Sequence, residues 1–164
     1  MMIRTIAAML VGSTVFFTAA PVFAETMVKE VSVAADLGAF KNPKAAQHYA
    51  NLADDLKNAI SARLANRIDP EKGSVVKVDI DGVALANSYE SAANVAQSKL
   101  VGHVTVTSEN ASNKADGYDL AISFEQAGPY FVAGTDISTI TTDSKEYYDA
   151  MIAAFADEVV KSLK

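Results

Sequence analysis

Four stretches of the chain alternate between apolar and polar residues, which is the period of a strand with one buried face. The clearest of them places Val76, Val78 and Ile80 on one face. The four stretches are Met27–Val33, Ser74–Ile80, Lys99–Glu109 and Tyr118–Glu125. A shorter stretch, Thr135–Thr142, is rich in β-branched residues and predicts a short edge strand. The pattern therefore predicts a sheet of four or five strands.

Two longer stretches repeat apolar residues every three or four positions, as amphipathic helices do. The first follows Asn42 and Pro43, which suit an N-cap and a first helical residue. The second begins at Asp143, which together with Glu146 fits a capping box. The apolar stripes are Tyr49, Leu52, Ala53, Leu56, Ile60 and Leu64 in the first helix and Tyr148, Met151, Ile152, Phe155, Val159 and Leu163 in the second.

The order of these elements predicts an α+β fold, β-α-β-β-β-(β)-α, in which two amphipathic helices cover one face of a mixed sheet. The first helix joins two strands and so predicts a right-handed crossover between parallel neighbours. The segment Val83–Gln97 has small residues and weak periodicity. We interpret it as the end of a strand followed by a loop that can contain a helical turn, and as the best candidate for a recognition loop.

The start of the chain has the composition of a signal peptide. Arg4 precedes an uncharged apolar run, residues 6–20, and small residues lie one and three positions before a cut between Ala24 and Glu25. The competing interpretation is a retained membrane anchor, which needs about 20 apolar residues. We favour cleavage because the apolar run is shorter than that and ends at Pro21.

Removal of residues 1–24 would leave residues 25–164 as a single α/β domain of 140 residues. The leader holds one of the 14 basic residues and none of the 20 acidic ones, so the remainder has a net charge of −7. This acidity argues against nucleic acid or an anionic membrane as a partner. The chain has no cysteine, which excludes disulfides, thiolate metal sites and a lipidated N-terminus.

No motif of catalysis or of metal or cofactor binding stands out. His48 and His103 have no ligand-like neighbours along the chain, and we interpret them as surface or half-buried side chains. The stretch Asp79–Gly82 resembles the start of a calcium loop, but hydrophobic Val83 stands where the loop needs its third oxygen ligand. We therefore expect no catalytic residue, cofactor or metal ion.

Tyr130 and Phe131 lie between glycine and proline residues, in a predicted loop. Exposed aromatic residues in a loop can form a partner contact. The alternative, which we favour, is that they close the end of the core. They are the only partner-contact candidates that the pattern offers.

Several stretches together resemble a group of small bacterial envelope proteins. The helix "YANLADDLKNAISARL", the strands "VVKVDI" and "LVGHVTVT" and the closing helix "YYDAMIAAFADEVVKSL" follow one another as they do in that group. The group includes transport-auxiliary lipoproteins, curli-assembly proteins and the amino-terminal domain of the periplasmic Tol protein. The chain departs from the lipoproteins because it has no cysteine for lipidation.

We expect a protein of the periplasm or secreted space, with no membrane span after cleavage. The first hypothesis is a non-enzymatic binding or envelope-assembly accessory whose partner is another envelope protein. The second is a carrier of a small molecule or lipid, with a pocket lidded by residues 83–97 and a cavity of roughly several hundred Å³. The third is an enzyme in which His103 works with a nearby carboxylate. The pattern does not predict the oligomeric state.

Overall fold

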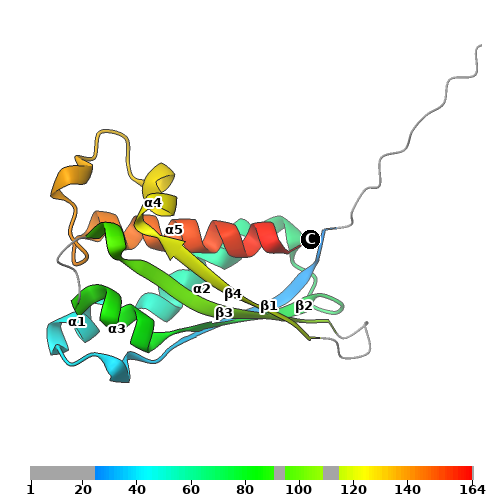
Figure 1. Cartoon of the computed structure of the whole chain (residues 1–164). Coiled ribbons are helices and arrows are strands. Elements are labelled where there is room, and N and C mark those ends of the chain that lie inside the picture. The colour runs from blue at the N-terminus through cyan, green and yellow to red at the C-terminus, as the bar shows by residue number, and fades with distance from the viewer. Residues whose placement is uncertain (1–24, 91–94, 109–114, 164) are drawn as a thin grey trace, which may run out of the picture.

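The structure is a computed structural model and describes residues 25–90, 95–108 and 115–163 (Figure 1). Glu25 lies within these residues, whereas Ala24 and the rest of the predicted leader lie outside them. The sheet has four strands, β1 (Val28–Ala35), β2 (Ser74–Ile80), β3 (Lys99–Thr107) and β4 (Ala115–Ser123). The predicted fold class, α+β with a mixed sheet, is confirmed.

The strands lie in the order β1-β2-β3-β4, so neighbours in the sheet are also consecutive strands of the chain. β1 and β2 are parallel, as the crossover predicted, and Val31 pairs with Val76. The other two pairs are antiparallel: Val78 faces Val104, and Val104 faces Tyr118. Residues that face the helices are therefore paired with one another across all four strands, and so are residues of the opposite face.

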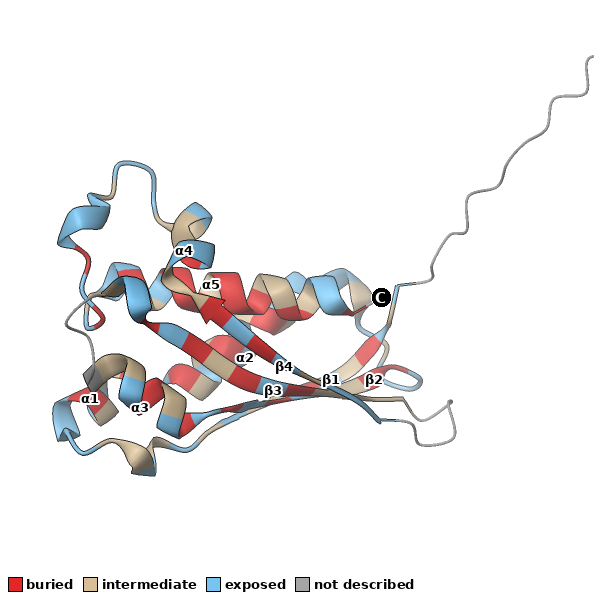
Figure 2. Ribbon diagram, in the orientation of Figure 1, coloured by how far each residue is buried: buried red, intermediate tan, exposed pale blue. Residues whose placement is uncertain are grey.

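Two helices, α2 (Leu52–Arg63) and α5 (Lys145–Ser162), pack against each other and against one face of the sheet. Figure 2 shows buried positions along α5 and along the strands that it covers. The largest fully buried side chains are Phe155, Leu52, Leu56, Ile60, Leu64, Ile80, Val28, Val76, Val78, Val104 and Val159. The predicted helical stripes thus form the core. The opposite face of the sheet carries exposed side chains, among them Lys77, Asp79 and His103.

The first predicted helix is confirmed at its start and broken in its middle. Asn42 accepts a hydrogen bond from the Lys44 amide and Pro43 follows, so α1 (Pro43–His48) begins as predicted. The helix then stops at Tyr49, and α2 begins at Leu52. The buried Tyr49 ring stacks on Phe40, with centroids 5.6 Å apart, and this packing replaces a continuous helix at the break.

The prediction that residues 83–97 form a strand end and a loop is wrong for the described part. α3 (Gly82–Glu90) is a helix that begins directly after β2, and η3 (Val95–Gln97) is a 3-10 turn. The Asp81 carboxylate accepts a hydrogen bond from the Ala84 amide and so caps the new helix. Leu85 and Ala86 are buried, which ties the segment to the core.

The region before α5 also differs from its prediction. Residues 135–142 form no strand; they contain the 3-10 turn η5 (Ile137–Thr139). Ser144, and not Asp143, is the N-cap of α5, because the Ser144 hydroxyl accepts from the Tyr147 amide. β4 ends at Ser123, whose capping box with Gln126 starts the short helix α4 (Phe124–Ala127). The side-chain caps thus stop the chain from extending into further strands.

The two ends of the domain meet at Arg67, in the 3-10 turn η2 (Ala65–Arg67). Its guanidinium donates to the carbonyl oxygen of Thr26 at 2.9 and 3.1 Å and to that of Leu163 at 2.6 Å. The Glu25 carboxylate lies 3.7 Å from Arg67 Nε, and the Arg67 side chain is only 12% exposed. One buried cation therefore joins the start of β1 to the end of α5.

Candidate functional site: a projecting arm

Residues 128–141 project from the end of the domain beyond α4 and α5 (Figure 1). This segment, called the arm below, begins with the 3-10 turn η4 (Gly128–Tyr130) and contains η5. Gly134 has a φ of 90°, a left-handed conformation that glycine adopts without strain, and it turns the chain at the far end. The arm leads directly into α5.

Several polar groups in the middle of the arm bond within the arm itself. The Thr135 amide and hydroxyl both donate to the Val132 carbonyl oxygen, at 3.0 and 2.8 Å. The Asp136 carboxylate accepts from the Ser138 amide and hydroxyl, and the Asp136 carbonyl oxygen accepts from the Thr139 hydroxyl. These bonds hold one backbone conformation, so a contact made by the arm costs little further ordering entropy.

Two large apolar side chains of the arm are exposed to solvent, whereas Ile140 is buried in the core. Val132 is 78% exposed and Ile137 is 50% exposed. The polar side chains Asp136, Ser138 and Thr139 are exposed as well, although each takes part in a hydrogen bond inside the arm. Large apolar side chains exposed on an ordered loop can form a contact surface. The sequence analysis did not single out these two residues, although Ile137 stood in the expected edge strand.

The predicted candidates Tyr130 and Phe131 lie at the base of the arm and are half-buried. The Phe131 ring packs on Phe124, with centroids 5.5 Å apart, and Phe124 stacks on Tyr147 of α5. The Tyr130 hydroxyl donates to the Asp157 carboxylate. Both side chains thus fasten the arm to the core, and the exposed apolar surface follows them in the chain.

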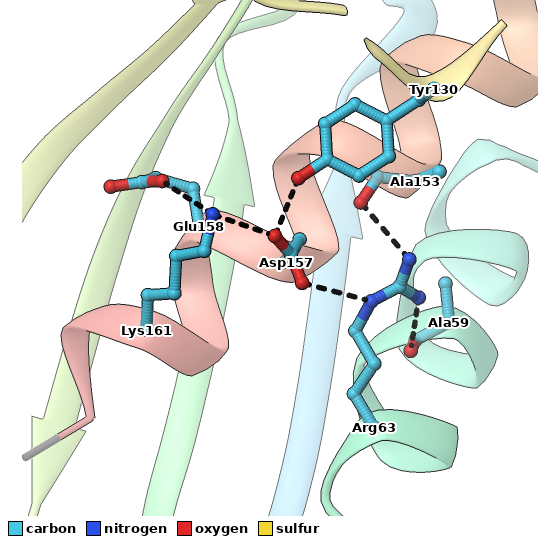
Figure 3. A network of polar contacts seen from close by, with 7 residues as sticks. All are labelled: Ala59, Arg63, Tyr130, Ala153, Asp157, Glu158 and Lys161. Carbon is cyan, nitrogen blue, oxygen red and sulfur yellow. Dashed lines mark hydrogen bonds and ion pairs between the residues drawn. The ribbon is translucent and has the colours of Figure 1, made fainter.

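Asp157 is the centre of the polar network that holds Tyr130 (Figure 3). Lys161 Nζ lies 2.8 Å from one carboxylate oxygen, and Arg63 Nε lies 3.8 Å from the other. Arg63 also donates to the carbonyl oxygens of Ala59 in α2 and Ala153 in α5. The hydrogen bonds from Lys161 and then Tyr130 hold the pKa of Asp157 below its ordinary value. The network ties the arm to both core helices.

The His103 side chain has a carboxylate partner that its neighbours in the chain did not reveal. Its Nδ1 lies 2.8 Å from Asp119 Oδ1, because the two residues are paired across β3 and β4. Asp79 of β2 is paired with His103 on its other side, and together they line an open hollow of about 420 Å³. The imidazole is 54% exposed, so water surrounds the pair. Within the described residues no group of three or more His, Cys, Asp or Glu side chains is placed to hold a metal ion.

The helix α3 covers an apolar cavity at the end of the core. It is lined by Tyr49, Leu52, Leu85, Leu100, Tyr147, Tyr148, Met151 and Ile152. Its volume is about 10 Å³, which is about the room that one water molecule needs. Side chains therefore fill the space beneath α3.

The chain matches no known protein family, and no curated protein is similar to it. In residues 25–90, 95–108 and 115–163, no helix combines the length and the apolar character that a membrane crossing requires.

Proposed function

We propose that this protein is an exported, non-enzymatic accessory of the bacterial envelope that binds another envelope protein through the arm. The observation that carries the proposal is the exposure of two large apolar side chains, Val132 and Ile137, on a segment whose turns are formed by internal hydrogen bonds. The predicted leader supplies the export step.

The structure gives less support to the other two hypotheses. A carrier needs a cavity of several hundred Å³, and the apolar cavity beneath α3 holds about 10 Å³. An enzyme using His103 needs a carboxylate within hydrogen-bond reach in a cleft; Asp119 supplies the carboxylate at 2.8 Å, but the imidazole and the carboxylate are 54% and 86% exposed on the open face of the sheet. The arm is the feature of the described residues that most resembles a binding surface.

The binding role is tested by position-specific cross-linking in the native host. A photoreactive p-benzoylphenylalanine is placed at position 132, or as a matched control at position 83. Val83 is 61% exposed on α3, away from the arm. We expect one discrete adduct with a second protein from position 132 and none from position 83. Equal labelling from both positions, or no adduct from position 132, would refute the proposal.

Export is tested separately by the intact mass of the protein purified from the periplasm of that host. The expected mass is that of a chain beginning at Glu25. A mature protein that still carries residues before Glu25, or that fractionates with the cytoplasm, would exclude the export step while leaving the binding test standing.

A further inference from the structure

The arm lies within a long stretch of the chain that has no basic residue. Between Ala115 and Ser144 there is no Lys, Arg or His, and there are five acidic residues. Three of them border or belong to the arm: Glu125 on α4, Asp136 in the arm and Asp143 just after it, all of them exposed. The two apolar side chains therefore project from a negatively charged surround.

Two of the basic residues near this region are paired with carboxylates, and a third, Lys99, lies opposite Ser123 just before α4. Lys145 at the start of α5 makes an ion pair with Asp149, and Lys161 pairs with Asp157. These ion pairs neutralise cations that would otherwise offset the acidity at the base of the arm. The exposed carboxylates of Glu125, Asp136 and Asp143 would attract a partner surface of positive charge.

A lipid surface does not fit this arrangement. Interfacial binding relies on basic side chains that attract anionic lipids and on aromatic or long aliphatic groups that enter the headgroup region. The arm has no basic residue, and its aromatic residues Tyr130 and Phe131 are half-buried at its base. Two aliphatic side chains amid carboxylates suit a protein pocket better than a bilayer.

We propose that the arm inserts Val132 and Ile137 into an apolar pocket of its protein partner, and that Lys and Arg side chains form the rim of that pocket. This inference rests on the proposed binding function and names the chemistry of the partner. The apolar contact slows dissociation of the complex. Attraction between the acidic residues around the arm and the basic rim of the pocket raises the association rate.

The test uses the mature protein and the partner identified from the position-132 adduct, both purified. Association and dissociation rates are measured at about 20 mM and about 300 mM salt, concentrations at which the Debye length falls from roughly 20 to 6 Å. The variants are Val132→Asp, Glu125→Lys and the control Glu71→Lys. Glu71 precedes β2, at the end of the sheet opposite α4.

We expect the association rate constant to fall about ten-fold between the two salt concentrations and about two- to ten-fold in Glu125→Lys at low salt, with dissociation little changed. Glu71→Lys should bind like the unaltered protein. Val132→Asp should dissociate at least about ten-fold faster, because it brings a carboxylate into the apolar pocket.

Three results would overturn the inference while leaving the binding function intact. One is an association rate that does not change with salt, and another is faster association of Glu125→Lys. The third is binding of the mature protein to zwitterionic phosphatidylcholine vesicles that Val132→Asp abolishes, which would make lipid the occupant. The absence of any adduct at position 132 would instead remove the proposed function itself.

Discussion

Tyr130 donates its phenolic hydrogen to the carboxylate of Asp157, 27 residues further along the chain. This bond joins the first turn of the arm to the middle of α5, and Lys161 and Arg63 complete the surroundings of the same carboxylate. The direction of the arm relative to the core therefore depends on a contact that can be removed without changing the size of the ring.

Tyr130→Phe should lower the free energy of unfolding by about 1 kcal/mol, the usual net value of such a hydrogen bond. It should also raise the pKa of Asp157, although the hydrogen bond from Lys161 remains. Urea unfolding and carboxyl ¹³C NMR measure the two effects. Tyr89→Phe is the control, because the Tyr89 hydroxyl has no hydrogen bond to the described residues. Equal effects of the two substitutions would contradict the role assigned to Tyr130.

The same pair predicts a dependence of stability on pH. Folding lowers the pKa of Asp157, so its stabilising contribution is complete above the ordinary value of about 3.9 and is lost as the pH falls through the lower folded-state value. Between pH 5 and pH 2, Tyr130→Phe should lose less stability than the unaltered protein. Urea midpoints over this range measure the loss. A steeper loss in the variant would contradict a pKa of Asp157 that Tyr130 lowers on folding.

Gly82 stands where a side chain cannot fit. A Cβ atom there would lie 1.8 Å from the carbonyl oxygen of Asp36, a backbone atom. Gly82→Ala should therefore destabilise the fold by about 3 kcal/mol. At Gly117 the atom in the way, 2.9 Å off, is the end of the exposed His103 side chain, which can move. Gly117→Ala should cost less than about 1 kcal/mol, and thermal unfolding of the two variants should separate them.

Arg67→Ala should cost about 2–3 kcal/mol, because the carbonyl oxygens of Thr26 and Leu163 lose a charged donor in a largely buried place. Arg67→Lys should lower the free energy of unfolding by less than Arg67→Ala does. It should still be less stable than the unaltered protein, since one ammonium does not reproduce the several donors of the guanidinium. Lys57→Ala, at an exposed lysine of α2, is the control. Urea unfolding ranks the three, and a loss no larger than that of Lys57→Ala would count against the clamp.

His103→Ala should change the free energy of unfolding by less than about 0.5 kcal/mol, because both members of the His103–Asp119 pair are exposed. It should also leave the adduct at position 132 unchanged. A loss of binding after this substitution would indicate that the contact surface is the open face of the sheet and not the arm.

The strands and the core helices could be predicted because their signal is burial itself. Val76, Val78 and Ile80 alternate with polar residues because the helices cover one face only, and Phe155 falls in a stripe of α5 for the same reason. Tyr49 shows the limit of this reasoning. It belongs to the apolar stripe, but its ring packs on Phe40, and the helix breaks there.

The missed features depend on side-chain bonds to the backbone, which periodicity does not record. Asp81 caps α3, and Leu85 and Tyr89 lie four residues apart. A capping residue followed by apolar residues at this spacing was the available sequence signal for that helix. Ser123 and Gln126 form a capping box of the S-x-x-Q type. In the arm, the β-branched residues between Thr135 and Thr142 favour a strand, but Asp136 accepts from Ser138 and turns the chain instead. No local pattern indicated the exposure of Val132.

Arg67 bonds to Thr26 and to Leu163, which lie 41 and 96 residues away from it along the chain. Closing a loop of 96 residues costs more chain entropy than closing a short one, and contacts of long sequence separation slow folding. The contact between Arg67 and the end of the last helix is therefore expected to form late, after the local turns and helices.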